Sequence, residues 1–157
     1  MVFRYPKPEV KLPNRRELLY FAHPEVLNNP NFRRLMLDIF WRVAQEIPCV
    51  YDVADSSNQA VEDLNGKRYE SQRYDLLVAQ GLVHQGNSLG YYYNSDGNNL
   101  YHVLATAKSI NVPALAIVDS RSVKLEQELK EHNATEVLMA GNPDDVQKTI
   151  VRMLKAA

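Results

Sequence analysis

Cysteine and long apolar runs are both scarce in this chain. Cys49 is the only cysteine among 157 residues, so no intramolecular disulfide can form, and a reducing, cytoplasmic location is expected. No apolar run approaches the roughly 20 residues that a membrane-spanning helix needs. Met1–Arg16 has no apolar segment typical of a secretory signal, so none is expected. A net charge of −1 argues against broad binding to nucleic acid or anionic membranes.

Several motifs that would specify a chemistry are also missing. The chain has neither a Walker A sequence nor the GxGxxG dinucleotide pattern, and it lacks the GxSxG elbow of serine hydrolases. Its four histidines do not follow the spacing of metal ligands. The sequence therefore predicts no metal site and no cofactor.

Short apolar runs do stand out, and almost every one ends in a cluster of polar, turn-forming residues. Alternation of such runs with helix-like stretches is typical of a parallel sheet. We expect a single flavodoxin-like or Rossmann-like α/β domain over residues 17–157. Its five-stranded, mainly parallel sheet should have the order 2-1-3-4-5, with helices on both faces. The expected strands are Leu18–Ala22, Cys49–Val53, Leu76–Ala79, Ala114–Val118 and Glu136–Ala140.

Helix signals fill most of the intervals. Apolar residues at three- and four-residue spacing predict a helix from about Asn31 to Pro48, and we expect Phe32, Phe40 and Trp41 to lie in the core. The next helix should end near Leu64, because Asn65-Gly66 is a turn signal. The last helix should begin after Asn142.

Two segments do not fit this regular alternation. Residues 1–16 are basic and rich in proline, and are expected to form an extended arm that either binds an anion or lies against its own domain or a partner subunit. Residues 82–99 form an irregular excursion rich in glycine and tyrosine. Its consecutive tyrosines, Tyr91–Tyr93, are suited either to ligand stacking or to a subunit contact.

The carboxyl ends of parallel strands meet at one edge of a sheet, where ligands bind. The loop after the third predicted strand contains glycines that would let backbone amides approach a phosphate. A simple turn within a hairpin is an equally good interpretation of these glycines. After the fourth strand, two hydroxyls and a guanidinium could hold an anion. The alternative is that Asp119 or Ser120 merely caps a helix. The candidate ligand-binding residues are Gly86, Asn87, Ser88, Gly90, Asn98, Ser120 and Arg121.

Other ionisable residues have less specific signals. His23 follows the first strand and is a candidate acid or base near neutral pH. The carboxylates Asp52, Asp55, Glu62 and Asp63 cluster around the second strand, where they either bind ribose hydroxyls or serve as caps and solvated charges. Cys49, at the start of a buried strand, is expected to be an inert core thiol.

The opening Tyr20-Phe21-Ala22-His23-Pro24 resembles the first-strand signature of nucleoside 2-deoxyribosyltransferase-like proteins. That resemblance implies a Rossmann-like fold and cleavage or transfer of a nucleoside N-glycosidic bond. The family's nucleophilic glutamate has no counterpart in Asp96–His102. Either Asp96 replaces it as the catalytic residue, with His23, or the chain binds without catalysis.

The leading hypothesis is therefore a protein that binds a nucleoside, a nucleotide or a related phosphorylated metabolite, with N-glycosidase or deoxyribosyltransferase-like activity if it is an enzyme. The alternative is a non-catalytic, homo-oligomeric interaction protein that uses the tyrosine-rich loop and the basic arm. A receiver domain is disfavoured, because the third strand ends at Gln80 where a phosphoacceptor aspartate is needed, and no lysine follows the fifth.

Overall fold

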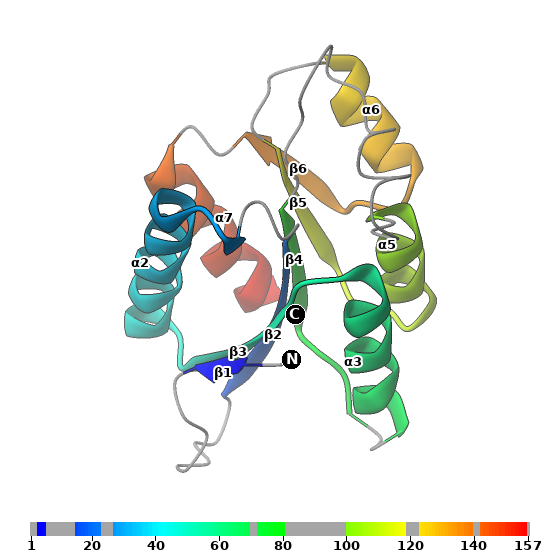
Figure 1. Cartoon of the computed structure of the whole chain (residues 1–157), viewed down its shortest axis with the longest axis horizontal. Helices are drawn as coiled ribbons and strands as arrows, with labels where there is room; N and C mark the ends of the chain where they lie inside the picture. Colours follow the sequence, from blue (N-terminus) through cyan, green and yellow to red (C-terminus); the bar gives the residue numbers. More distant parts are fainter. Residues whose placement is uncertain are drawn as a thin grey trace.

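A computed structural model gives the arrangement of residues 3–5, 15–22, 27–69, 72–80, 100–118, 123–139 and 142–156, and the description below concerns these residues. They form a central sheet with helices on both faces (Figure 1). In chain order the elements are β1 (Phe3–Tyr5), β2 (Arg16–Ala22), α2 (Pro30–Glu46), β3 (Cys49–Ala54), α3 (Ser57–Tyr69), β4 (Leu76–Gln80), α5 (Leu100–Ser109), β5 (Ala114–Val118), α6 (Val123–Glu131), β6 (Glu136–Met139) and α7 (Pro143–Ala156).

The sheet confirms the predicted flavodoxin-like topology. Its strand order is β1-β3-β2-β4-β5-β6, and the five strands from β2 to β6 are parallel. Taken in chain order, those five strands have the predicted order 2-1-3-4-5. A sixth strand, β1, pairs antiparallel with β3 at the edge of the sheet, with Arg4 opposite Asp52.

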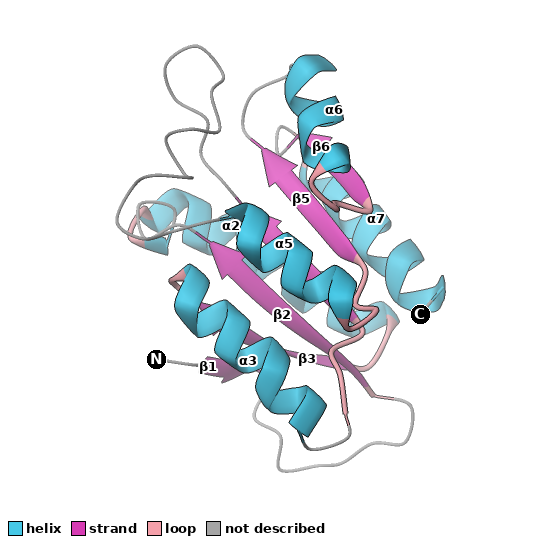
Figure 2. Cartoon of the chain, turned by 90° about the vertical axis from the view of Figure 1, so that its right-hand side faces the viewer, coloured by secondary structure: helices cyan, strands magenta, loops and turns pink. Residues whose placement is uncertain are grey.

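Two helical layers cover the sheet. Helices α2 and α7 pack against each other on one face, and α3, α5 and α6 lie on the other (Figures 1 and 2). The central strands β2, β4 and β5 are apolar on both sides because both of their faces are covered. Among the described helices, none has the length and apolar character needed to cross a bilayer.

Helix α2 meets the sheet through an aromatic cluster. The ring of Phe40 packs edge-on against Tyr20, with centroids 5.1 Å apart, and stacks on Tyr51 at 4.4 Å. Phe40 is buried as expected, whereas the prediction for its neighbour Trp41 is wrong, because 53% of Trp41 is exposed. One residue along a helix is a rotation of about 100°, which carries Trp41 away from the sheet. The side chain of Phe32 lies outside the described residues.

Helix α3 continues beyond the end that the sequence predicts. It runs through Asn65 and Gly66 to Tyr69, although a glycine in a helix interior costs about 1 kcal/mol relative to alanine. The continuation places the Lys67 ammonium 2.6 Å from a carboxylate oxygen of Glu17 on β2, and both side chains are largely buried. This tertiary contact accompanies the continuation and overrides the local turn signal.

The start of α7 and the end of α5 follow their sequence signals. The side chain of Asn142 accepts the backbone N–H of Asp144 at 3.0 Å and so caps α7. Asn111 adopts a positive φ of 60° just beyond α5, where Val112 N–H donates to the Ala107 carbonyl at 2.9 Å. These caps stop each helix where the chain must turn back to the sheet.

Neighbouring positions 40 and 41 should differ sharply in their contribution to stability. Phe40→Ala removes a fully packed ring and is expected to lower the free energy of unfolding by about 3–5 kcal/mol. Trp41→Ala removes a half-exposed side chain and should cost on the order of 1 kcal/mol. Urea denaturation followed by far-UV circular dichroism measures both; similar losses at the two positions would contradict the placement of α2.

Candidate functional site

The carboxyl edge of the sheet is the candidate site, because all five parallel strands end there. Register pairing places Ala22 beside Gln80, Gln80 beside Ile117, and Val118 beside Met139. Loops that follow strands at such an edge commonly hold the functional residues of parallel α/β folds. Among the described residues at this edge, Gln80 stands out, since it is a polar side chain at the end of an apolar strand.

Gln80 is buried and paired with a tyrosine. Only 3% of Gln80 is exposed, and the hydroxyl of Tyr20 on the adjacent strand donates to its Oε1. Burial, and to a smaller extent the neighbouring Tyr51, raises the pKa of Tyr20 above its ordinary value, so this hydroxyl keeps its proton. The pair places a neutral amide at the end of the central strand, and the edge has no negative charge at this position.

The pairing of Tyr20 with Gln80 is not among the contacts predicted from the sequence. From the sequence alone, Gln80 is only a residue unsuited to accepting a phosphoryl group, and Tyr20 is only part of a strand. The available signal was a glutamine at the end of the run Leu76–Ala79, because a polar side chain inside a covered parallel sheet must find a hydrogen-bond partner.

All residues of the predicted ligand site lie outside the described residues. Their convergence on the sheet edge is therefore still a prediction from topology. This holds for both predicted catalytic residues and for the predicted ligand-binding residues: His23, Asp96, Gly86, Asn87, Ser88, Gly90, Asn98, Ser120 and Arg121.

The acidic residues around β3 serve different structural roles. Asp52 is 4% exposed, and its Oδ2 accepts a hydrogen bond from the Tyr74 hydroxyl at 2.5 Å. Asp55 is exposed, and the adjacent Ser56 caps α3 by accepting the Gln59 backbone N–H at 3.1 Å. Ser56, and not one of the four carboxylates, therefore supplies this cap of α3.

Asp63 on α3 has an unusual environment for a carboxylate, because one of its two oxygens is buried without a hydrogen-bond partner among the described residues. Its Oδ1 accepts a hydrogen bond from the Gln59 amide at 2.7 Å, while its Oδ2 is buried without a hydrogen-bond partner among the described residues. Burial raises the pKa of Asp63 to about 6, and the charges of Asp52 and Glu62 contribute to the same shift, which the Gln59 hydrogen bond opposes. Asp63 therefore titrates close to physiological pH.

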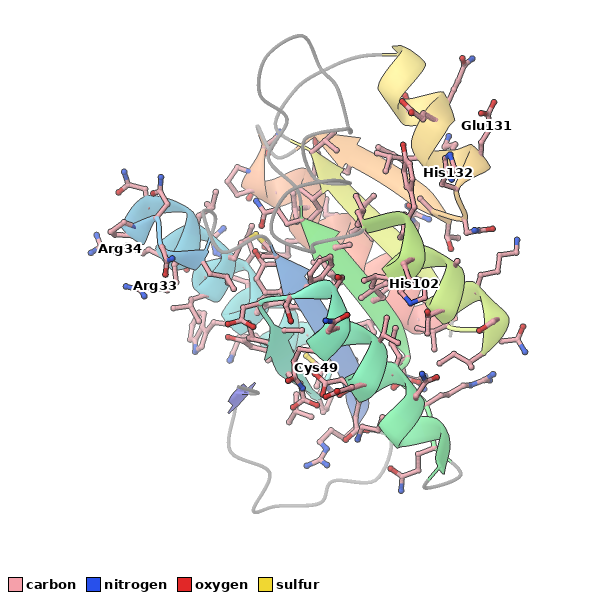
Figure 3. All side chains as sticks on the ribbon, turned by 45° about the vertical axis from the view of Figure 1, so that its right-hand side comes forward. Arg33, Arg34, Cys49, His102, Glu131 and His132 are labelled. Carbon is pink, nitrogen blue, oxygen red and sulfur yellow. The ribbon has the colours of Figure 1, made fainter. Side chains whose placement is uncertain are left out.

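Cysteine and histidine contribute no reactive group to this edge within the described residues. Cys49 is buried, as expected, and burial raises the pKa of its thiol to about 11. His132 stacks on the ring of Tyr101 at 3.7 Å and, with His102, lies on the α5–α6 side of the molecule (Figure 3). No group of three or more potential metal ligands occurs in the described part of the chain.

Comparison with known proteins identifies the fold. No family model and no curated sequence matches the chain. Among solved structures, it is similar to the receiver domain of the Francisella response regulator 1452, with a TM-score of 0.58 and 14% identity over 90% of this chain and 98% of that one. It is also similar to the signal receiver domain of NarL from Mycobacterium tuberculosis, with a TM-score of 0.61 and 12% identity over 92% and 100%.

A third similar structure is an enzyme of which the matching region is a small part. The Francisella novicida lysine decarboxylase LdcF has a TM-score of 0.60 and 14% identity, over 90% of this chain but 17% of that one. At these identities the similarity establishes the fold alone. The chain thus has the flavodoxin-like arrangement of receiver domains.

These comparisons overturn the resemblance suggested by the opening motif. Most of the similar structures are receiver domains or response regulators, whereas the sequence suggested nucleoside 2-deoxyribosyltransferase-like proteins. The predicted nucleoside or nucleotide ligand and the predicted action on an N-glycosidic bond are therefore wrong. An apolar strand followed by a turn is a local feature that many parallel α/β folds share, so five residues could not distinguish them.

The Tyr20–Gln80 pair should stabilise the edge of the sheet measurably. Tyr20→Phe leaves the buried Gln80 amide oxygen without its donor, which is expected to cost about 1–3 kcal/mol of unfolding free energy. The double variant Tyr20→Phe/Gln80→Leu should cost less than the sum of the two single changes. Urea denaturation of the wild type, Tyr20→Phe, Gln80→Leu and the double variant measures these free energies. Additive losses of unfolding free energy would contradict the pairing.

Stability should also depend on the titration of Asp63. Because its pKa is raised to about 6 in the folded state, the stabilisation from its protonated form is fully present below the unfolded value near 4 and is lost as pH rises through 6. Asp63→Asn should therefore flatten the dependence of the urea midpoint on pH between about 4 and 7. An unchanged pH dependence in the variant would refute the assignment.

Proposed function

We propose that this chain is a protein-interaction domain of receiver fold that works without phosphorylation on its central strand. The observation that carries the proposal is the buried Gln80 at the end of β4, with its amide oxygen bonded to Tyr20. The similar structures include a response regulator receiver domain and a response regulator in red light signaling, and this supports a signalling role, for which we infer protein partners. A cytoplasmic location, favoured by the single cysteine, stays a prediction.

The chemistry of glutamine is the reason for excluding phosphoryl transfer at this position. Aspartyl phosphates form when a carboxylate oxygen attacks phosphorus. The Gln80 side chain has no ionised oxygen, its amide nitrogen is a hydrogen-bond donor, and its oxygen is already bonded to Tyr20. Because Gln80 cannot accept a phosphoryl group, phosphorylation at this position cannot switch the domain.

The chain should therefore stay unmodified when offered a small phosphodonor. Incubation with acetyl phosphate and Mg²⁺ should give no mass increase corresponding to a phosphoryl group, and no shift in melting temperature. Intact-protein mass spectrometry measures the first and thermal denaturation the second, with a receiver domain known to accept phosphate from acetyl phosphate as a reagent control. A phosphoryl adduct that hydroxylamine removes would show an acyl phosphate and overturn the proposal.

A further inference from the structure

The two large apolar side chains that are exposed in the described part of the chain belong to the same helix. Leu37 is 47% exposed and Trp41 is 53% exposed, and both lie on α2. A spacing of four residues places them next to each other on the helix surface. Scattered exposed apolar residues are ordinary, but a pair that includes a tryptophan forms a local apolar patch.

Two arginines extend this patch toward the start of the helix. Arg33 is four residues before Leu37, and Arg34 is three residues before it, so both lie next to the apolar pair along the helix surface. Figure 3 shows both arginine side chains directed away from the body of the molecule. We call the surface formed by Arg33, Arg34, Leu37 and Trp41 the α2 patch.

The charge of the α2 patch is not neutralised within the described structure. Among the described residues, no ion pair includes Arg33 or Arg34. Arg42 differs, because its guanidinium lies 3.2 Å from Asp38 and 3.4 Å from Asp144. Arg33 and Arg34 are therefore available to pair with an acidic group of a partner, whereas Arg42 already pairs with acidic residues of its own chain.

The position of these cations within the helix is unfavourable for the isolated domain. The N-terminal end of a helix carries a partial positive charge, which favours acidic residues in the first turn. The first turn of α2 contains no acidic residue, and Arg33 and Arg34 lie near that end. An acidic group from a partner would be attracted by both the arginines and the helix end.

We propose that the α2 patch docks an amphipathic helix of another protein, with apolar residues that cover Leu37 and Trp41 and with Asp or Glu residues that pair with Arg33 and Arg34. This inference rests on the proposed function and specifies the partner's chemistry. A helix fits because the patch runs along one side of α2 for about two turns, the geometry of helix-on-helix packing. Tryptophan and arginine are the side chains most enriched among residues that dominate binding energy.

Trp41 makes the docking directly measurable. It is the chain's only tryptophan, so tryptophan emission, excited selectively over the nine tyrosines, reports on this patch alone. A displayed library of randomised amphipathic helices without tryptophan should be selected on the full chain and depleted on the Trp41→Ala variant. The selected peptides are expected to combine apolar residues at three- and four-residue spacing with Asp or Glu, to shift Trp41 emission to the blue and to protect it from acrylamide.

Mutations then distinguish the contribution of charge to peptide affinity from that of apolar contact. Arg33→Glu/Arg34→Glu should weaken binding of a selected peptide about 10-fold or more, and Leu37→Ala should weaken it as well. Lys108→Glu, a charge reversal on the exposed surface of α5 across the sheet, should leave it unchanged. Circular dichroism confirms that each variant is folded, and higher salt should weaken the wild-type complex.

Other occupants of the α2 patch would give different results. The proposal is overturned if no selected peptide depends on Trp41, or if the peptides are basic. It is also overturned if Trp41 emission shifts with the chain's own concentration, which would indicate a second copy, or only with anionic lipid vesicles. None of these results bears on acetyl phosphate and Gln80, so this inference and the proposed function can fail separately.

Discussion

The parallel pairing of β2 with β3 on one side and β4 on the other is the constraint on which the rest of the structure depends. β2 lies between these neighbours with both faces covered, and the register matches Leu18 to Tyr51 and to Leu76. A shift by one residue would exchange the faces of every side chain on the strand. This register is therefore what brings the carboxyl ends of the strands to one edge and places Tyr20 within reach of Gln80.

Tyr20 connects the core to that edge. Its ring packs against Phe40 of α2, and its hydroxyl donates to Gln80 on β4. Packing of Phe40 on the sheet also sets the rotation of α2, because the helix can turn only one side toward the strands. The same rotation exposes Leu37 and Trp41. The buried aromatic cluster and the exposed α2 patch are thus two consequences of one helix orientation.

The receiver-like fold and the chemistry at its edge are separate properties. Backbone topology depends on apolar strands, helix caps and right-handed connections, and these tolerate great variation in sequence. Chemistry at the strand ends depends on single side chains, such as an amide in place of a carboxylate at Gln80. The sequence argument against a receiver domain relied on that side chain and on the absence of a lysine after the fifth strand. It therefore said little about the fold, which the comparisons show to be receiver-like.

The sequence by itself determined the five parallel strands, their order and most helix ends, since apolar runs, helical periodicity and capping residues such as Asn142 act locally. Only the tertiary structure decided the continuation of α3 through Gly66, where Lys67 meets Glu17 across the fold. It also decided that Trp41 faces outward and that Gln80 is bonded to Tyr20. In each of these cases the partner is remote in sequence, or the outcome depends on which side of a helix meets the sheet, and neither property is encoded in a short window of residues.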